Sequence, residues 1–394
     1  MKRFRQHPLA IGAVGLVVMV GLATGLAAVS APADQGSTYG YLKLFNEVLA
    51  LVRHNYVETV PDETLMKGAY EGLLASLDDQ SEYLTAAQYE RLLATSTTSK
   101  ATAGIYLTRR AGVYFVASVL PGSDAEKKGV RLGDRIRKIG NRSGRDLGYS
   151  EAQRLLEGEE GNTVSVEISR MDEPTHDKVT IALHELPLPL PSLDATDQNV
   201  PVVRVPSFGP GTADRLGSIF ETFARKKAAK VLIDLRGNAW GDPQEAARAA
   251  AIFDGAGVQA TLRGRDGDEQ TLRGKGPRTE WRGQLLLLTN PGTAMSAELF
   301  AAALTDAGVA KTAGEQTLGR GGERDVIQLA NGDYLMLTVR KYVSPGGTAW
   351  HGEGLKPAVP IPLDPDLPFG ERAGRQLEKA KEWLADSGQA AKAA

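Results

Sequence analysis

The chain has 394 residues, of which 46 are Lys or Arg and 48 are Asp or Glu; 42% of it is hydrophobic and 24% is charged. These proportions are ordinary for a globular protein and exclude a disordered, collagen-like or multi-span membrane chain. The net charge of −2 gives no drive toward nucleic acid. The absence of cysteine excludes disulfides, thiolate metal sites and cysteine nucleophiles, and the five scattered histidines form no helical zinc motif. We therefore expect no metal and no organic cofactor.

Residues 1–31 are typical of an export signal. Lys2, Arg3 and Arg5 precede an uncharged apolar run over residues 9–29, which ends in the small-residue cleavage pattern Val29-Ser30-Ala31. The run is also just long enough to span a bilayer, so an uncleaved inner-membrane anchor is the alternative. Both interpretations place the rest of the chain outside the cytoplasm, in the periplasm or cell envelope.

Residues 38–99 are predicted to form a helical N-terminal unit. Apolar side chains recur at helical spacing from Tyr41 to Val52, and again from Leu65 to Leu74 after a break at Pro61. A turn at Asp78-Asp79 is followed by a short helix predicted over residues 84–93. Nothing in this part indicates a catalytic role, and the pattern favours a unit that serves packing or dimerisation.

Residues 100–186 change to short β-branched strands, predicted over 105–107, 113–119 and 164–168, with a helix over 149–156. Together with the segment Gly133-Asp134-Arg135-Ile136, this pattern resembles a PDZ domain. PDZ domains add an extended peptide as a strand and hold its terminal carboxylate on backbone amides. The resemblance places the peptide-binding loop on Ala103-Gly104-Ile105-Tyr106-Leu107. Tyr106 replaces a glycine of the family pattern there, and its side chain would reshape the loop of backbone amides that binds the carboxylate.

A proline-rich segment, residues 187–194, is expected to be an extended linker rather than a proline-recognition motif. Residues 195–363 then alternate strands and helices, which indicates an α/β core. The predicted strands are 200–205, 231–235 and 285–289, the predicted helices are 212–227, 242–253 and 296–307, and a hairpin surrounds Asn331-Gly332. Residues 370–394 are expected to form an exposed C-terminal helix and tail.

Segments that follow the core strands carry a more specific resemblance. They are residues 234–238, 290–299 and 314–321, and segments 74–78 and 81–85 near the start agree with them. Together they resemble the carboxyl-terminal processing peptidases (tail-specific proteases) over about residues 38–363. The resemblance implies the fold class α/β + β, with an N-terminal helical unit, a PDZ domain and a ClpP/crotonase-like α/β peptidase core.

The resemblance also implies a serine nucleophile, a lysine base 25 residues later and a glutamine four residues beyond, which orients the lysine. A serine hydroxyl needs a neighbouring base, and a lysine can serve only when burial lowers its pKa. With Glu298 and the glycines of 314–321 fixing the register, these positions fall on Met295, Arg320 and Arg324. All three catalytic positions are therefore replaced.

The oxyanion loop of the family is altered as well. Its pattern ends in a glycine pair whose amides face the developing oxyanion, and here that pair reads Trp240-Gly241. Arg320 cannot act as a base, because a guanidinium stays protonated. Ser296 is the candidate for a displaced nucleophile, and His351 is the candidate for a replacement base.

The sequence therefore predicts an exported, PDZ-containing relative of these serine peptidases that is catalytically silent. Its expected partners are unfolded or C-terminal peptide segments of exported proteins, or an active paralogous protease, which it would bind as a scaffold or regulator. The alternative is an active endopeptidase that cuts such segments with Ser296. A third interpretation is an envelope protein whose groove binds nothing. The family resemblance also implies a homodimer formed through the terminal helices.

Overall fold

The protein is described by a computed structural model over residues 37–98, 101–170, 176–194, 200–255, 257–276 and 278–390. The predicted export segment and its cleavage pattern lie outside these residues. No helix among the described residues is long and apolar enough to cross a membrane. The chain divides into two compact units, residues 1–70 and 71–394.

The first unit contains α2 (Thr38–Asn55) and most of α3 (Asp62–Ala75). No residue of α2 is buried. Its large apolar side chains are exposed, with Tyr41 at 62%, Leu44 at 56%, Val48 at 50% and Leu51 at 55%. These four residues lie three or four positions apart, so they form one apolar stripe along the helix.

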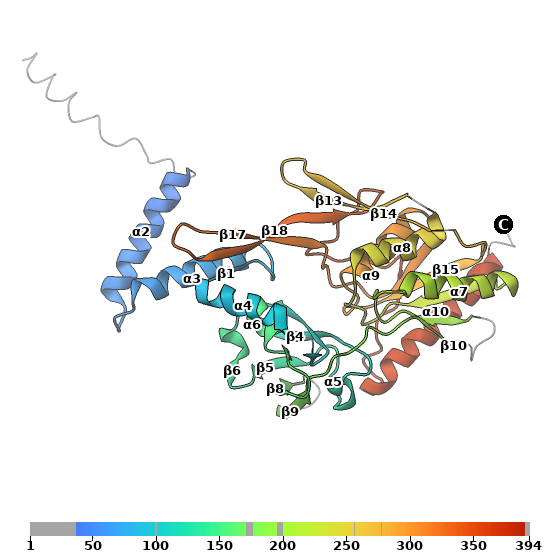
Figure 1. Ribbon diagram of the computed structural model, residues 1–394, viewed down its shortest axis with the longest axis horizontal. Helices are drawn as coiled ribbons and strands as arrows, with labels where there is room; N and C mark the ends of the chain where they lie inside the picture. The colour runs from blue at the N-terminus through green and yellow to red at the C-terminus, as the bar shows by residue number, and fades with distance from the viewer. Residues whose placement is uncertain are drawn as a thin grey trace, which may run out of the picture. The chain divides into compact units, whose positions relative to one another are not determined.

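In the second unit, the predicted PDZ segment forms a sheet in the order β3-β4-β5-β8-β9 (Figure 1). The strands are β3 (Ile105–Arg110), β4 (Val113–Val119), β5 (Arg135–Ile139), β8 (Thr163–Ser169) and β9 (His176–Ala182), and β6 (Arg142–Ser143) pairs with β5. Two further strands, β2 (Ala101–Thr102) and β7 (Glu157–Gly158), pair with each other. The short helices are α5 (Asp124–Lys127), η1 (Gly144–Asp146) and α6 (Tyr149–Arg154). Because β3 is an edge strand, one side of its backbone is left for other partners.

The α/β core is built on a six-stranded sheet in the order β10-β11-β12-β15-β16-β19. These strands are β10 (Ser192–Asp194), β11 (Val202–Arg204), β12 (Lys230–Asp234), β15 (Gln284–Thr289), β16 (Ala310–Gly314) and β19 (Val359–Pro360), and only β10 runs antiparallel to its neighbour. Alternate residues point to opposite faces, as the period of a strand requires. On one face of the sheet, Ile233 and Leu287 belong to a buried hydrophobic cluster with residues of α7 (Thr212–Arg225), α8 (Pro243–Asp254) and α9 (Ser296–Asp306). Leu232 and Leu286 share another with α10 (Phe369–Ala390) on the other face (Figure 1).

A third sheet joins the start of the second unit to the core. Its order is β1-β18-β13-β14, from β1 (Glu82–Leu84), β18 (Tyr334–Val343), β13 (Gly257–Gly264) and β14 (Glu269–Gly274), and β17 (Gly322–Gln328) pairs with β18. Glu82 lies opposite Met336. The helix predicted to begin at Leu84 is therefore wrong at its start, because Leu84 ends β1 and α4 (Ala86–Thr98) begins after it. The β13–β14 hairpin was not predicted.

The predicted C-terminal helix forms as α10, but one face of it is buried rather than exposed. Leu384 is 2% exposed, and Ala380 and Gln376 are buried as well. The alternating residues of the core strands explain this, since an apolar second face of the sheet has to be covered. The apolar stripe of α10 covers that face.

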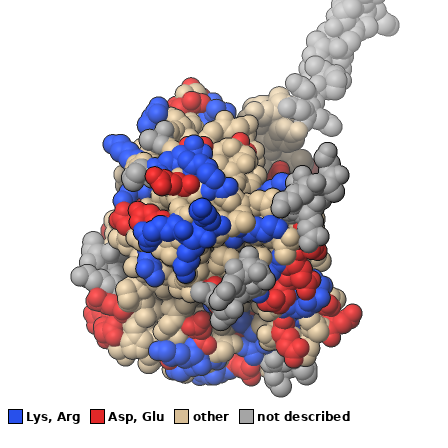
Figure 2. Space-filling model, turned by 90° about the vertical axis from the view of Figure 1, so that its right-hand side faces the viewer, with Lys and Arg blue, Asp and Glu red and all other residues tan. Residues whose placement is uncertain are grey.

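Figure 2 shows one face of the molecule, on which Lys and Arg side chains lie among Asp and Glu side chains. Opposite charges also pair on α7 and α8, where Arg248 lies 2.7 Å from Glu245 and 3.1 Å from Asp214. The pair with Asp214 is exposed and contributes only about 0–1 kcal/mol, whereas Glu245 is buried. Stability therefore rests on the buried clusters.

Leu384→Ala should lower the free energy of unfolding by about 3 kcal/mol, because it leaves a cavity beneath α10. Glu382→Ala, an exposed change on the same helix, should alter stability by no more than about 0.5 kcal/mol. Urea unfolding of both variants measures the difference. Equal stabilities would mean that α10 does not cover the sheet.

Candidate functional site

Met295 lies at the turn between β15 and α9, at the predicted nucleophile position. Its φ is 53° and its ψ is −118°, a positive φ that costs energy in any residue other than glycine. Hydrolases use a sharp, strained strand-to-helix turn of this kind to expose a nucleophile. Met295 is 36% exposed. The turn therefore presents its side chain outward, but that side chain is a thioether without a hydroxyl.

Glu298 ties this turn to the loop that carries the predicted base position. Its fully buried carboxylate accepts hydrogen bonds from the backbone N–H groups of Met295 (3.1 Å), Gly319 (2.6 Å) and Arg320 (2.7 Å), and from the Thr317 hydroxyl. Burial raises the pKa of Glu298 to about 7, although the four donors act to lower it. One carboxylate thus holds positions 295 and 320 together.

Arg320, at the base position, is held in a buried ion pair. Its side chain is 4% exposed and binds both carboxylate oxygens of Asp79, with Nη2 at 2.6 Å from Oδ2. Nη2 also donates to the Thr108 hydroxyl at 3.1 Å. The guanidinium has no lone pair with which to take a proton. This geometry fixes a permanent cation where a catalytic base would stand.

Arg324, at the position of the orienting glutamine, also turns toward the start of the second unit. It donates to the Gln80 carbonyl at 3.4 Å, and its Nη1 lies 4.0 Å from a Glu82 carboxylate oxygen. The guanidinium carbons of Arg320 and Arg324 lie 5.5 and 5.6 Å from the centre of the Tyr149 ring. Both arginines therefore contact α6 of the PDZ segment as well.

Trp240 occupies the oxyanion loop and contacts the PDZ segment. Its indole N–H donates to the Ser118 hydroxyl at 3.1 Å, and its ring meets the Tyr106 ring edge-on at 6.0 Å. Its backbone N–H lies 3.4 Å from the Asn238 side-chain oxygen. Gly241 remains glycine for a steric reason, since its φ is 120° and a Cβ would lie 2.4 Å from the Phe208 backbone. The Trp240 side chain thus contacts the PDZ segment, while Gly241 is required for the close approach of this loop to Phe208.

The structure does not bring a base to Ser296. Ser296 is fully buried, and its Oγ has no hydrogen-bond partner among the described residues. The ring of His351 is buried too, with Nε2 3.4 Å from Asp78 Oδ2. Its Nδ1 has no partner in the described part of the chain and lies against Gly322. His351 and Ser296 thus form no hydrogen bond with each other.

The predicted peptide-binding loop is largely buried. Ala103, Ile105 and Leu107 are 0% exposed, and Gly104 has a φ of 73°. A Cβ on Gly104 would lie 2.5 Å from the Ser123 Cβ, so glycine is required there. Tyr106 is half-buried, and burial raises the pKa of its phenol well above the ordinary value.

Sequence reasoning missed the acidic residues that meet these positions. Asp79, Asp78 and Glu82 lie in the segment in which no chemistry was expected, although segments 74–78 and 81–85 had signalled the family resemblance. Ser118 had no sequence signal at all.

A cavity of about 710 Å³ lies beside Arg320, lined in part by Asp79, Thr108 and His351.

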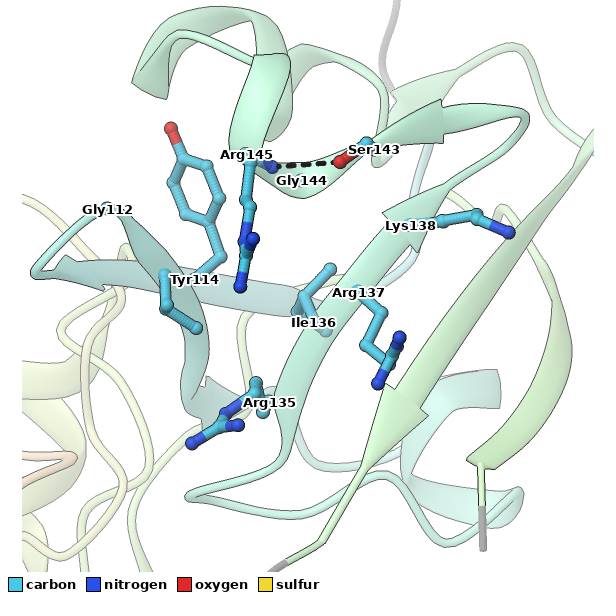
Figure 3. Close-up of a pocket in the computed structure, with 10 residues that line it drawn as sticks. Gly112, Tyr114, Arg135, Ile136, Arg137, Lys138, Ser143, Gly144 and Arg145 are labelled. Atoms are coloured by element: carbon cyan, nitrogen blue, oxygen red, sulfur yellow. Dashed lines mark hydrogen bonds between the residues drawn. The ribbon is translucent and has the colours of Figure 1, made fainter.

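A second cavity, of about 280 Å³, lies on the PDZ segment among Arg135, Arg137, Lys138 and Arg145 (Figure 3). Glu167 pairs with two of these cations, lying 3.4 Å from Arg137 and 3.2 Å from Lys138. None of the predicted site residues lines this cavity. It is therefore separate from the site built around Met295 and Arg320.

Glu298→Gln should change how stability depends on pH. The pKa of Glu298 is about 7 in the folded chain against 4.5 ordinarily, so the folded chain holds a proton that the unfolded chain releases between these values. The free energy of unfolding therefore falls as pH rises through this window, and the variant lacks this contribution. The stability difference between wild type and variant should shift by about 3 kcal/mol across the window. Urea unfolding at about pH 4.5 and about pH 8 measures it. A constant difference, like that expected for the exposed control Glu371→Gln, would contradict the raised pKa.

Comparisons with known proteins identify two domains in the chain. Residues 199–361 match the model of peptidase family S41, and residues 115–170 match that of the PDZ domain. The chain is 28% identical over 329 residues to the carboxy-terminal processing protease CtpA of Bacillus subtilis (strain 168), covering 82% of this chain and 70% of that protein. It is 27% identical over 329 residues to CtpB of the same organism, covering 79% and 66%. The chain thus spans about two thirds of the length of these relatives.

The fold is similar to that of the photosystem II D1 C-terminal processing protease. The TM-score is 0.64 at 23% identity, covering 86% of this chain and 91% of that protein. This likeness confirms the predicted fold class, a mixed α/β protein with a PDZ domain and a peptidase core. Residues 199–361 therefore carry a peptidase family S41 domain and residues 115–170 a PDZ domain, and the homologues of the chain are carboxy-terminal processing proteases.

Proposed function

We propose that this chain is a catalytically silent member of its family that binds peptide segments or a partner protein as a scaffold or regulator. The observation that carries the proposal is the buried ion pair between Arg320 and Asp79, because it fills the base position with a cation that cannot accept a proton. At the nucleophile position, Met295 offers no hydroxyl. Acyl transfer by the family's route needs both groups.

The proposed ligands are unfolded or C-terminal peptide segments of exported proteins. The support is the PDZ domain, a fold that takes extended peptides as an added strand. An active paralogous protease is a further partner of the same proposal. We also propose that the protein is exported to the periplasm or cell envelope, as a cleaved or an inner-membrane-anchored protein. The support is the three cations and the apolar run over residues 9–29.

The competing function is an active endopeptidase with Ser296 as its nucleophile. What favours it is the Ser296 Oγ, which has no hydrogen-bond partner among the described residues. What opposes it is the burial of that hydroxyl, because a scissile carbonyl would have to reach a fully buried atom. One cleavage assay distinguishes the two functions.

The purified chain is incubated with an unfolded reporter that carries an apolar C-terminal tail, beside the variants Ser296→Ala and Met295→Ser. We expect no cleavage by any of them, because Met295→Ser supplies a hydroxyl while Arg320 still occupies the base position. Cleavage is followed by loss of full-length reporter on gels. An active S41 peptidase serves as the positive control, and circular dichroism checks that each variant is folded.

Cleavage by the wild type that Ser296→Ala abolishes would overturn the proposal and establish a nucleophile displaced by one residue. Cleavage by the wild type that survives Ser296→Ala would also overturn it, and would place the chemistry elsewhere.

We further propose that the chain forms a homodimer through α2. The support is the exposed apolar stripe of Tyr41, Leu44, Val48 and Leu51, since large exposed apolar surfaces usually mark an interface. Leu44→Glu combined with Leu51→Glu should convert a dimer to a monomer, halving the mass measured by light scattering. Lys43→Glu, on the same helix, should leave the mass unchanged. A wild-type chain that is monomeric at high concentration would refute the proposal.

A further inference from the structure

The free edge of β3 is where a PDZ domain would pair with a peptide strand. On this edge, the outward backbone groups belong to alternate residues, Ile105, Leu107 and Arg109. Their other side is taken up by β4, since β3 and β4 pair from Ile105↔Val119 to Arg110↔Val113. A peptide can add to β3 only if the groups on the free edge can exchange their present partners for it.

Side chains of α6 already occupy part of this edge. Gln153 bridges two of the groups, because its Nε2 donates to the Ile105 carbonyl at 3.0 Å and its Oε1 accepts from the Leu107 N–H at 3.3 Å. The Tyr149 hydroxyl lies 3.4 Å from the Leu107 carbonyl. One amide side chain thus satisfies a donor and an acceptor that a bound strand would use.

Asp79 occupies the next position along the same edge. Its Oδ2 accepts from the Arg109 N–H and from the Thr108 hydroxyl, both at 3.3 Å. Asp79 reaches β3 from the segment that precedes β1, outside the PDZ sheet. Arg320 binds the same carboxylate and the same Thr108 hydroxyl. The residue at the family's base position therefore holds Asp79 against β3.

We propose that Gln153 and Asp79 close the peptide-binding edge of the PDZ domain, and that Arg320 is the positioning residue that keeps it closed. This inference rests on the proposed function, because it concerns how the proposed peptide-binding site is regulated. A peptide with an extended backbone has to displace both side chains, and displacing Asp79 breaks the ion pair to Arg320. Peptide binding is thereby coupled to the altered site in the core.

The replaced positions act together in this arrangement. Arg320 and Arg324 both lie against Tyr149, which is on α6 with Gln153. Trp240 contacts Ser118 on β4 and Tyr106 on β3. All three side chains lie between the core and the peptide groove. We infer that residues in catalytic positions now serve as the contact that fixes the groove shut.

The experiment measures binding of a short fluorescein-labelled peptide that ends in three valines with a free carboxylate. The chains compared are the wild type, Gln153→Ala, Asp79→Ala and Arg320→Lys. Each variant removes one closing contact, so each should bind the peptide about tenfold more tightly than the wild type. Arg320→Lys is the decisive variant, because Arg320 does not bond the free backbone edge itself. Glu151→Gln is the matched control, since Glu151 lies on α6 but pairs with Arg142.

Hydrogen exchange of β3 provides a readout that does not need a ligand. In Gln153→Ala and Asp79→Ala, the amides of residues 105–110 should exchange faster than in the wild type, because Leu107 and Arg109 lose their acceptors. Exchange in the core strand β12 should stay unchanged, which distinguishes local opening from global unfolding.

Unchanged exchange in β3 for both variants would overturn the closure, whether or not any peptide binds. Equal peptide affinity of the wild type, Arg320→Lys and Glu151→Gln would overturn the role of Arg320 while leaving the proposed binding function intact. Faster exchange without peptide binding by any chain would support the closure and instead count against the proposed function.

Discussion

The site depends on one buried carboxylate. Glu298 receives hydrogen bonds from both halves of the site, and beside it the Leu318 N–H donates to the Thr293 carbonyl at 2.9 Å. Three of the four donors to Glu298 are backbone groups. This bonding is therefore independent of the side chains at positions 295 and 320. Different side chains at these two positions would be compatible with the same main-chain geometry.

The side chains at the predicted catalytic positions make structural contacts. Arg320 and Arg324 bind acidic and carbonyl groups of the segment before and within β1, and Trp240 binds Ser118 of β4. A buried arginine with one carboxylate partner is costly to separate from it. The core is thus tied to the segment before β1 by a strong directional interaction, and Arg320 also reaches the PDZ domain through the Thr108 hydroxyl. In an active peptidase the same volume would have to remain available to substrate.

Much of this fold could be predicted from periodicity. The strand over 113–119 and the starts of the helices at 212 and 296 follow from apolar spacing and turn residues alone. The β13–β14 hairpin was not predicted, because its sequence is polar and its strands do not alternate cleanly between polar and apolar residues. The burial of one face of α10 was not predicted, because an amphipathic sequence does not indicate which surface its apolar face packs against. In the site, the resemblance located positions 295, 320 and 324, but the partners of Arg320 are distant in sequence. Nothing in the local pattern around Asp79 says that it reaches an arginine more than 200 residues away.

The backbone of Met295 has a further consequence. A residue other than glycine at φ 53° costs about 1–3 kcal/mol. The hydrogen bond from the Met295 N–H to the Glu298 carboxylate helps to hold this conformation. Glycine adopts a positive φ at no steric cost, so the turn at Met295 stores conformational energy that the packing of the rest of the fold has to supply.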